Sequence, residues 1–531
     1  MKIKHNMSFA YFTVVFGILI AKAAGFVRDI IFAGAFGTTV ESDIYFQIYG
    51  VVNLVFTCLG IALSTLVIKN LNKEENATEE KKRAYVSAFL QKTALWLLIV
   101  TAVLYAGARL LVDILLPNID EQYVGLAVRL TYLMLPSLFC VVIAYIISGV
   151  LQNNRVFFIP SIVSLPYNAL IISTLLVPDV SITTVAAATT IGWFLHIVFQ
   201  LPSFYKKGYR FFLTASSSGE TSGEKAVTKT SKETGKSRFG AVPREIAFIF
   251  ISNLMFQLCF IIDKVFVSGD EGMIATVNYA SNLFVTISSV FVVAMSNVVF
   301  PAISKNYEEG QIDYVRRLLR YIITFMFVIF VPYLLVVSLF GRQIIALLYE
   351  RGSFTSDSTS ATATAFAIYS FGILGYVAQE LFNKILYLAS RYRITVTATI
   401  SVAVAKVALD AVLVPRFGAM AAAVTTTFLL TIYAIVVATT MRHVVGAYLN
   451  HTLAKNIMKV IAGAAVALVV YLGFYFTTPG ILTSRVMFVV PLLVCGVVYI
   501  IMLLALGLLR SLFSDIKTVR QKTDGGEDSV I

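Results

Sequence analysis

Two basic side chains interrupt an apolar segment near the start of the chain. The run Lys22-Ala-Ala-Gly-Phe-Val-Arg28-Asp29 lies within residues 9–38, which are otherwise mostly apolar. On insertion scales a cation costs roughly 2.5 to 3.5 kcal/mol at the centre of a bilayer, so a membrane helix rarely carries two of them without a use. The pair therefore indicates a binding function inside the protein.

Other kinds of chemistry lack the residues that they require. The sequence contains no P-loop, HExxH or GxSxG motif and no nucleic-acid signature. Its four cysteines lie in apolar runs without a CxxC pair, which is typical of packing residues. His196 is typical of a helix-packing histidine whose hydrogen bonds are satisfied. We predict no catalytic residue, cofactor, metal site or nucleic-acid partner.

The composition is that of a polytopic helical membrane protein, with 58% apolar and 13% charged side chains in 531 residues. With about 20 apolar residues to a crossing, we expect an all-α fold with about 14 transmembrane helices. Their expected ranges are 9–34, 42–69, 84–116, 123–151, 155–177, 183–205, 245–268, 274–303, 312–348, 360–389, 393–414, 418–442, 454–477 and 484–512.

The connections between these helices differ in charge. Lys and Arg account for the net charge of +13 and cluster in the connections at 69–83 and 206–244, whereas those at 117–122 and 268–272 carry only acids. Basic connections face the cytoplasm. We therefore expect a multi-pass protein with both termini in the cytoplasm, and we attribute the basic charge to topology.

The two halves of the chain are related by a repeat. Four pairs of segments share an offset of 235 to 237 residues: Lys69-Asn70 with Lys305-Asn306, Arg155 with Arg391, 175–178 with 412–415, and 185–190 with 420–426. Six crossings return the chain to the same side, so the copies insert in the same orientation around a pseudo-two-fold along the membrane normal.

This repeat gives the expected domain organisation. An N-terminal six-helix lobe covers 1–213, and a Ser-, Thr- and Lys-rich cytoplasmic linker covers 214–242. A second six-helix lobe covers 243–450. Helices 13 and 14 follow at 451–513, and a cytoplasmic tail at 514–531 ends the chain. The last helix pair has no counterpart in the repeat and serves either as packing support or as a second surface for a lipid tail.

The first helix, the repeat and the helix count resemble the MurJ/MviN family of lipid II flippases, in the multidrug/oligosaccharidyl-lipid/polysaccharide exporter superfamily. The motif of that family's first helix fits Lys22, Gly25, Arg28 and Asp29. Further matches along the chain are Phe36-Gly37, Asp43-Ile-Tyr45-Phe46, Asn53, Tyr279-Ala280 and Phe300-Pro-Ala-Ile-Ser-Lys305.

The resemblance implies alternating access in a bacterial cytoplasmic membrane, with lipid II or a related polyprenyl-diphosphate glycan as the substrate. It also implies a cationic cavity for the head group and a groove beside helices 13 and 14 for the lipid tail. Lys22 and Arg28 would bind the diphosphate, because arginine presents a fork of charged donors. Asp29 is a further expected substrate-site residue beside them. Asp43 and Asn53 would shape the mouth of the cavity. Membrane lipids and cell-wall synthases are further expected partners.

The sequence departs from the family at three positions. Phe56, Asn282 and Val285 stand where the family often has Arg, Arg and Glu. A member with fewer charges in its cavity could carry another lipid-linked oligosaccharide, such as a capsule or teichoic-type precursor, or bind lipid II through Arg129 or Lys384. A cation-coupled drug antiporter of the same superfamily and a non-transporting scaffold for wall synthases are the other readings.

The resemblance also implies a coupling site in the second half. Part of the family holds sodium with an acid in helix 7, an Asn and an Asp in helix 11 and a Thr in helix 12. Here those places are taken by Asp263, Lys406, Asp410 and Thr426, with a lysine in place of the Asn. Lys406 could replace sodium, could exchange protons, or could form a static ion pair that joins two helices.

Overall fold

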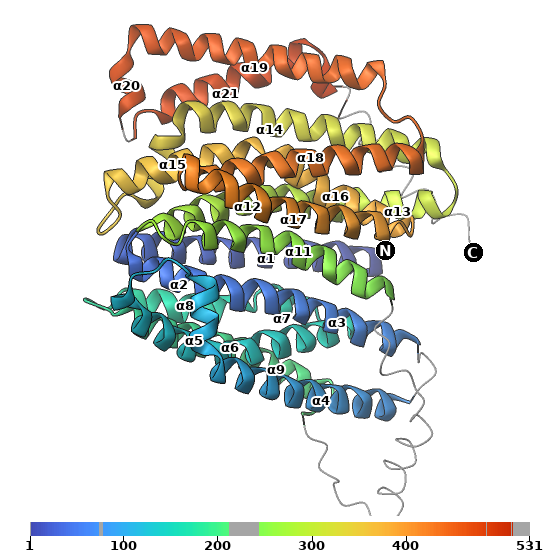
Figure 1. The fold of residues 1–531 in the computed structure, drawn as a ribbon. Coiled ribbons are helices and arrows are strands. Elements are labelled where there is room, and N and C mark those ends of the chain that lie inside the picture. Colours follow the sequence, from blue (N-terminus) through green and yellow to red (C-terminus); the bar gives the residue numbers. More distant parts are fainter. Residues whose placement is uncertain (1, 74–77, 212–243, 485, 511, 513–531) are drawn as a thin grey trace, which may run out of the picture. The chain divides into compact units, whose positions relative to one another are not determined.

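The computed structural model describes residues 2–73, 78–211, 244–484, 486–510 and 512. Within these ranges the chain is helical, and no strand occurs (Figure 1). The elements of the first half are α1 (Lys2–Phe36), α2 (Val40–Gly50), the π-helical turn η1 (Val51–Val55), α3 (Phe56–Lys73), α4 (Glu79–Ala106), α5 (Ala108–Leu115), α6 (Glu121–Asn153), α7 (Phe158–Ser161), α8 (Ser164–Leu175) and α9 (Ile182–Lys206).

The second half consists of helices throughout its described residues. They are α11 (Arg244–Phe266), α12 (Met273–Val298), α13 (Phe300–Glu308), α14 (Ile312–Tyr349), α15 (Ser356–Phe371), α16 (Ile373–Leu388), α17 (Tyr392–Phe417), α18 (Met420–Val445), α19 (His451–Thr477), α20 (Pro479–Thr483) and α21 (Val489–Ala505). Side-chain caps start several helices: Ser181 accepts a hydrogen bond from the backbone N–H of Thr184, and Asn450 accepts one from Leu453.

The chain divides into two compact units. Unit 1 contains residues 1–32 and 40–261, and unit 2 contains 33–39 and 262–531. The border passes through α1 and α11, so each of these helices contributes to both units. The predicted linker at 214–242 lies outside the described residues.

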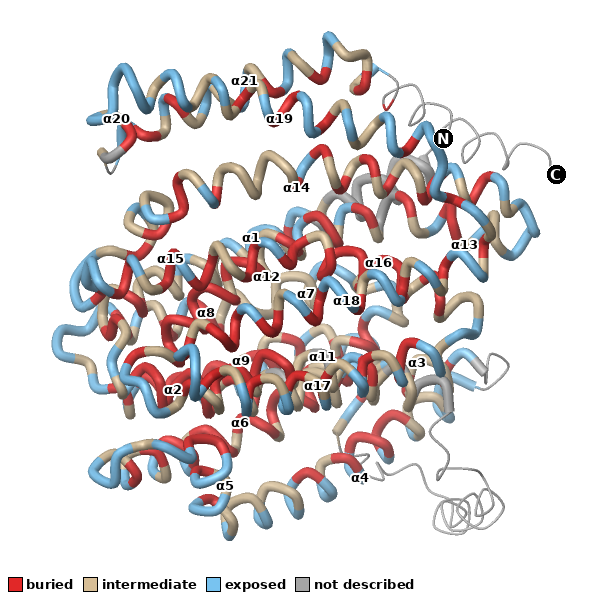
Figure 2. The backbone as a smooth tube through the Cα atoms, turned by 45° about the horizontal axis from the view of Figure 1, so that its top comes forward, coloured by how far each residue is buried: buried red, intermediate tan, exposed pale blue. Residues whose placement is uncertain are grey.

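Unit 1 is built around α6. This helix packs against α3, α4, α5 and α9, and 72% of its most apolar window is buried (Figure 2). Pro136 lies inside α6 among these buried residues. A helix that is apolar on every side is expected at the centre of a helical bundle, and it gives unit 1 a fixed frame for the helices around it.

Unit 2 ends in a helix pair that packs against α14. The side chains of Val460 and Ala464 on α19 meet Tyr499 and Leu503 on α21, and the hydroxyl of Tyr499 donates to the backbone oxygen of Val328 on α14 at 2.8 Å. Only 22% of the apolar window of α19 is buried. The C-terminal helix pair is therefore attached through one face, and its other face is apolar and exposed.

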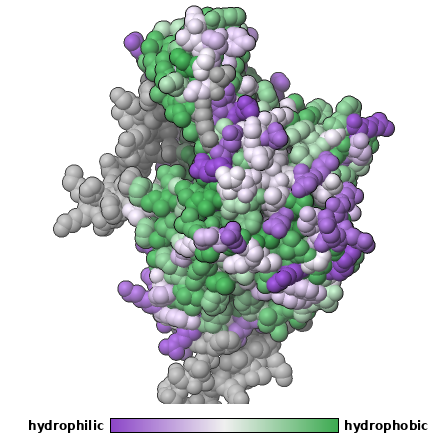
Figure 3. Space-filling model, turned by 90° about the vertical axis from the view of Figure 1, so that its left-hand side faces the viewer, coloured by the Kyte–Doolittle hydropathy of each residue, from purple (hydrophilic) through white to green (hydrophobic). Residues whose placement is uncertain are grey.

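Many large apolar side chains are exposed along the helices. Examples are Leu95 and Val103 on α4 and Leu493 on α21, which are 62%, 65% and 62% exposed. Figure 3 looks along the helices onto one end, where hydrophilic side chains interrupt the hydrophobic surface. In the described part of the chain, ten helices are long and apolar enough to cross a membrane, and an eleventh is added if the bent pair α15 and α16 forms one span. This pattern confirms the predicted all-α, polytopic membrane fold.

With α1, α11 and α21 counted as well, the eleven candidates would make the fourteen predicted crossings, a number that stays a prediction. Several of the expected helices are interrupted among the described residues. The range 42–69 contains the π-helical turn η1, 84–116 is interrupted at Gly107, 155–177 is broken between α7 and α8, 274–303 is interrupted at Val299, and 360–389 bends by 47° at Gly372. The ranges 42–69 and 155–177 each still form one candidate span.

Two helices of the predicted repeat end in the same way. After α6, Arg155 adopts a positive φ of 58°, and the next N–H, from Val156, bonds back to the oxygen of Leu151. After α16, Ser390 has a φ of 55°, and the N–H of Arg391 bonds back to Leu386. Both are Schellman-type ends, and their offset of 235 residues agrees with the predicted repeat.

Candidate functional site

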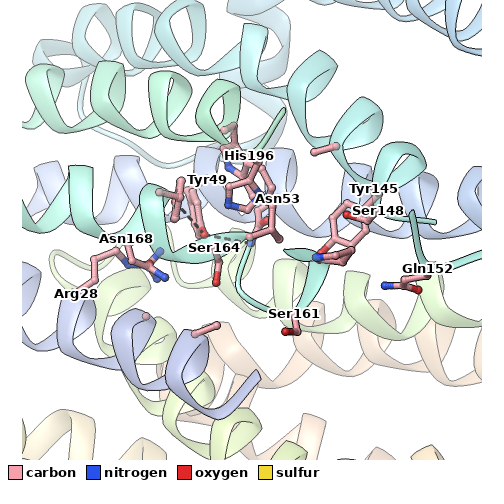
Figure 4. A pocket seen from close by; sticks show the side chains of 17 residues that line it. Arg28, Tyr49, Asn53, Tyr145, Ser148, Gln152, Ser161, Ser164, Asn168 and His196 are labelled. Atoms are coloured by element: carbon pink, nitrogen blue, oxygen red, sulfur yellow. Dashed lines mark hydrogen bonds between the residues drawn. The ribbon is translucent and has the colours of Figure 1, made fainter. Parts of the chain in front are cut away.

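A cavity of about 390 Å³ lies inside unit 1 (Figure 4). Its volume falls within the ~300–1,000 Å³ of typical small-molecule sites. In the figure, Arg28 and Asn168 lie together at one end, and Gln152 lies at the other. The 17 lining residues are Ala21, Gly25, Arg28, Tyr49, Asn53, Ala144, Tyr145, Ser148, Gln152, Pro160, Ser161, Val163, Ser164, Tyr167, Asn168, Trp193 and His196.

Arg28 is the one permanent charge among these lining residues. Its guanidinium donates two hydrogen bonds to Asp29 Oδ1, from Nε at 3.0 Å and from Nη2 at 2.7 Å. The same group lies 5.5 Å from the ring centre of Tyr167 and 6.0 Å from that of Tyr49, within cation–π range. The side chain remains 16% exposed. Arg28 is thus held by one carboxylate and two rings while it still faces the cavity.

The interruption in the second predicted helix sets the position of Asn53. This residue lies in the π-helical turn η1, and such turns are frequent at functional sites. Its Nδ2 donates to the hydroxyl of Tyr49 at 3.2 Å, and the hydroxyl of Tyr167 donates to the same oxygen at 3.3 Å. Asn53 and the two tyrosines therefore form a connected hydrogen-bonded group beside Arg28.

Two glycines near the cavity differ in what a side chain there would meet. A Cβ atom at Gly25 on α1 would be 3.8 Å from Asn168 on α8, an ordinary contact. A Cβ atom at Gly192 on α9 would be 2.6 Å from the ring of Tyr167, too short without movement of that ring. The absence of a side chain at Gly192 thus fixes how near Tyr167 can lie to α9.

Only some of the predicted substrate residues line the cavity. Arg28 and Asn53 line the cavity, and Asp29 pairs with Arg28. Lys22 and Asp43 are not among the described residues that line it; Lys22 is half-buried on α1 and Asp43 is buried on α2. Their roles in binding stay predictions.

Most of the lining residues are absent from the prediction, among them Tyr49, Tyr167, Asn168, Trp193 and His196. The prediction for His196 needs correction, because its Nε2 has no hydrogen-bond partner among the described residues. Aromatic residues are common along this chain, with 40 Phe and 26 Tyr. Nothing in their spacing separates those that face a cavity from those that pack. Asn168, an amide in an apolar run, was the available signal.

A second cluster of charges lies in unit 2, around Lys406. Lys406, Asp410 and Asp263 are each 0% exposed, and the ammonium forms ion pairs with Asp263 Oδ1 and, at 2.6 Å, with Asp410 Oδ2. It also donates to Thr425 Oγ1 at 2.7 Å and to the backbone oxygen of Ala422 at 2.9 Å. Four oxygen atoms thus surround one cation.

Hydroxyl groups complete this cluster. Thr425 donates to Asp410 Oδ1 at 2.5 Å. Asp263 accepts from Thr426 at 2.8 Å and from the hydroxyl of Tyr369 at 2.9 Å. The structure therefore brings together all four residues predicted for the coupling site and adds Thr425 and Tyr369. A ring of oxygen atoms is also what small metal cations prefer, and here an ammonium group occupies its centre.

A scan against protein-family models matches residues 32–495 to the family described as "Lipid II flippase MurJ". A protein of Burkholderia cenocepacia named lipid II flippase MurJ is 23% identical over 422 residues, which is 78% of this chain and 79% of that protein. A probable lipid II flippase MurJ of Buchnera aphidicola subsp. Schizaphis graminum is 23% identical over 381 residues, or 70% of each chain.

Solved structures show the same fold. A structure titled "Lipid II flippase MurJ, inward closed conformation" matches with a TM-score of 0.72 and 20% identity, over 92% of this chain and 97% of that one. An inward-facing multidrug resistance MATE family transporter matches with a TM-score of 0.61 and 14% identity, over 81% of this chain and 95% of that one.

Proposed function

The chain belongs to the lipid II flippase MurJ family, and on this premise we propose that it moves lipid II from the cytoplasmic to the outer leaflet of a membrane. Lipid II is a polyprenyl diphosphate that carries a sugar-peptide head group. The proposed movement is alternating access, in which the cavity opens first to one side and then to the other. No covalent bond is made or broken in such a step.

The observation that supports this proposal most directly is Arg28 in its cavity. A diphosphate that enters the membrane interior needs a permanent positive charge, because an unpaired anion in an apolar medium is very costly. Arg28 offers a planar set of donors, already held by Asp29 and the rings of Tyr49 and Tyr167. The diphosphate would compete with Asp29 for this guanidinium and bind on the cavity side.

The other predicted substrate residues act around this group. Lys22, six residues before Arg28 on α1, would add a second positive charge on the path of the head group. Asn53 would offer an amide at the cavity wall, and Asp43 would shape the cavity mouth. We place the protein in the bacterial cytoplasmic membrane with both termini inside, in contact with membrane lipids and with cell-wall synthases.

The Lys406 cluster would serve as the coupling or locking site. Its ammonium fills the centre of a ring of oxygen atoms, so we infer that the chain transports without sodium. The static ion pair remains as the other reading of the same geometry. Transport in vesicles in which sodium is replaced by choline should proceed at an unchanged rate; transport that stops without sodium would refute this inference.

The proposed function is tested in bacteria depleted of their own lipid II flippase. Expression of this chain should restore growth and the exposure of lipid II on the outer leaflet. Arg28→Ala should abolish both. Arg109→Ala is the matched control, because Arg109 belongs to an exposed ion pair with Asp113 on α5 and should support full rescue. Membrane levels of each variant are measured by immunoblot.

A failure to rescue, with normal membrane levels, would favour a different lipid-linked oligosaccharide. The observation that supports this alternative is the set of apolar or neutral residues at Phe56, Asn282 and Val285, where the resemblance led us to expect charges. A drug antiporter is a weaker alternative, supported by the MATE-like fold alone.

A further inference from the structure

Three unsatisfied polar atoms gather at the cavity of unit 1. Among the described residues, several buried side-chain nitrogen or oxygen atoms have no hydrogen-bond partner. Three of them belong to lining residues of this one cavity: Asn168 Oδ1, Trp193 Nε1 and His196 Nε2. Their side chains are only 3%, 6% and 6% exposed. Buried polar groups are normally paired, so these three atoms at one cavity are donors and acceptors that a bound molecule could use.

These groups offer a mixed set of hydrogen bonds without charge. The indole Nε1 donates only, the Asn168 oxygen accepts only, and a neutral histidine nitrogen does one or the other. No carboxylate and no lysine occurs among the 17 lining residues. The chemistry therefore suits a neutral group that bears both donors and acceptors, such as a hydroxyl or an acetamide.

Aromatic rings surround the same three atoms. The ring centres of Trp193 and His196 are 4.4 Å apart, and the ring of Tyr167 lies 5.4 Å from the first and 5.5 Å from the second. Tyr167 is also the ring that faces the guanidinium of Arg28. The aromatic cluster is thus contiguous, through Tyr167, with the proposed diphosphate position.

We propose that Asn168, Trp193 and His196 form a sugar subsite, in which the aromatic cluster packs against the apolar face of a pyranose ring while the three polar atoms bind its hydroxyl or acetamide groups. This inference rests on the proposed function and names the part of the head group that the subsite takes. The sugar attached to the diphosphate would enter the subsite while Arg28 holds the phosphate.

The chain supplies its own reporter for the test. It contains two tryptophans, and Trp96 is 48% exposed on α4, so Trp96→Phe leaves Trp193 as the only tryptophan. The Trp96→Phe protein in lipid nanodiscs is titrated with lipid II and, separately, with a polyprenyl diphosphate that carries no sugar. We expect lipid II to change the emission of Trp193 and the sugar-free lipid to leave it unchanged.

Binding of the same two lipids to variants completes the test. Asn168→Leu and Trp193→Phe should weaken binding of lipid II about tenfold, since one unpaired hydrogen bond has about this effect, and should leave binding of the sugar-free lipid unchanged. Trp96→Phe, the matched control for Trp193→Phe, should alter neither. Arg28→Ala should weaken both.

Two failures are distinguishable. If the wild-type chain binds neither lipid, the proposed function falls and the subsite falls with it. If lipid II binds but Asn168→Leu and Trp193→Phe affect both lipids equally, or neither, the sugar subsite alone is refuted. The Trp193→Phe variant keeps an aromatic ring at this position. The melting temperature of the variant is measured as well, so that a loss of binding can be distinguished from a loss of fold.

Discussion

The Arg28 cavity of unit 1 and the Lys406 cluster of unit 2 solve the same problem, a charge inside an apolar bundle, in opposite ways. Arg28-Asp29 on α1 and Asp263-Lys264 on α11 are separated by 235 residues, the offset of the predicted repeat, and the order of their charges is reversed. Arg28 remains 16% exposed and faces a cavity, whereas Asp263 is completely enclosed.

The difference arises on a neighbouring helix. In unit 2, α17 supplies Lys406, which pairs with Asp263 and fills the space beside it. In unit 1 the residue at the corresponding offset of 236 is Leu170 on α8, which carries no charge. Arg28 on α1 is thus available to a ligand in the cavity of unit 1. Asp263 on α11 is instead paired with Lys406 inside unit 2.

The largest expected effect comes from the same substitution made in each unit. Lys406→Met removes the cation between two buried carboxylates and should lower the free energy of unfolding by about 3–5 kcal/mol. Arg28→Met should lower it by less than about 1 kcal/mol, because Asp29 keeps access to the cavity. Thermal unfolding of the full chain in detergent gives both values. Equal losses of unfolding free energy in the two variants would contradict the proposed difference between the units.

Removal of one tyrosine hydroxyl in each unit should give a smaller difference. Tyr369→Phe deletes a donor to the buried carboxylate of Asp263 and should cost about 1.5–3 kcal/mol of stability. Tyr167→Phe deletes a neutral hydrogen bond to Tyr49 and should cost about 0.5–1.5 kcal/mol. Unfolding midpoints of the two variants test this order, and a larger loss for Tyr167→Phe would reverse the comparison.

Overpacking beside the cavity should have a small effect on stability and a visible one on transport. Gly192→Ala would push on the ring of Tyr167 and should cost about 1 kcal/mol, because the ring borders a cavity into which it can move. Transport should fall as the support of Arg28 shifts.

Gly496→Ala on α21 is the control for this change, because a Cβ atom there meets nothing within 4 Å. It should leave both unfolding and lipid II exposure unchanged. Full transport by Gly192→Ala would show that the position of Tyr167 does not matter to Arg28.

Much of the fold follows from the sequence because one property, apolar length, decides it. The membrane helices could be predicted in this way. Arg28, predicted as a substrate residue because it is a cation in an apolar run, does line a cavity, and its role stays a prediction. The interruptions of the helices could not be predicted. The π-helical turn at Val51–Val55 contains ordinary apolar residues around Asn53, and their composition is compatible with a regular helix.

The residues of the candidate sites could likewise be predicted only in part. Lys406 and Asp410 share a helix face by their spacing of four, but Asp263 joined them through family resemblance, since no local pattern links residues that far apart. Tyr167 and Trp193 were missed because their contacts depend on how α8 meets α9, which Gly192 decides. Which aromatic side chains face the cavity depends on how the helices pack against one another. In a chain with so many aromatic residues, no local sequence pattern identifies them.

The π-helical turn η1 also has a consequence for how this helix tolerates insertions and deletions. A regular helix advances by about 100° per residue, and the wider turn absorbs one residue without advancing the helix in the usual way. The faces of α2 and α3 are therefore out of phase with each other. Deletion of one residue here, such as Val52, should therefore restore regular hydrogen bonding and leave the face that α3 turns toward α6 unchanged. The same deletion in a regular part of the helix would rotate everything after it by about 100°.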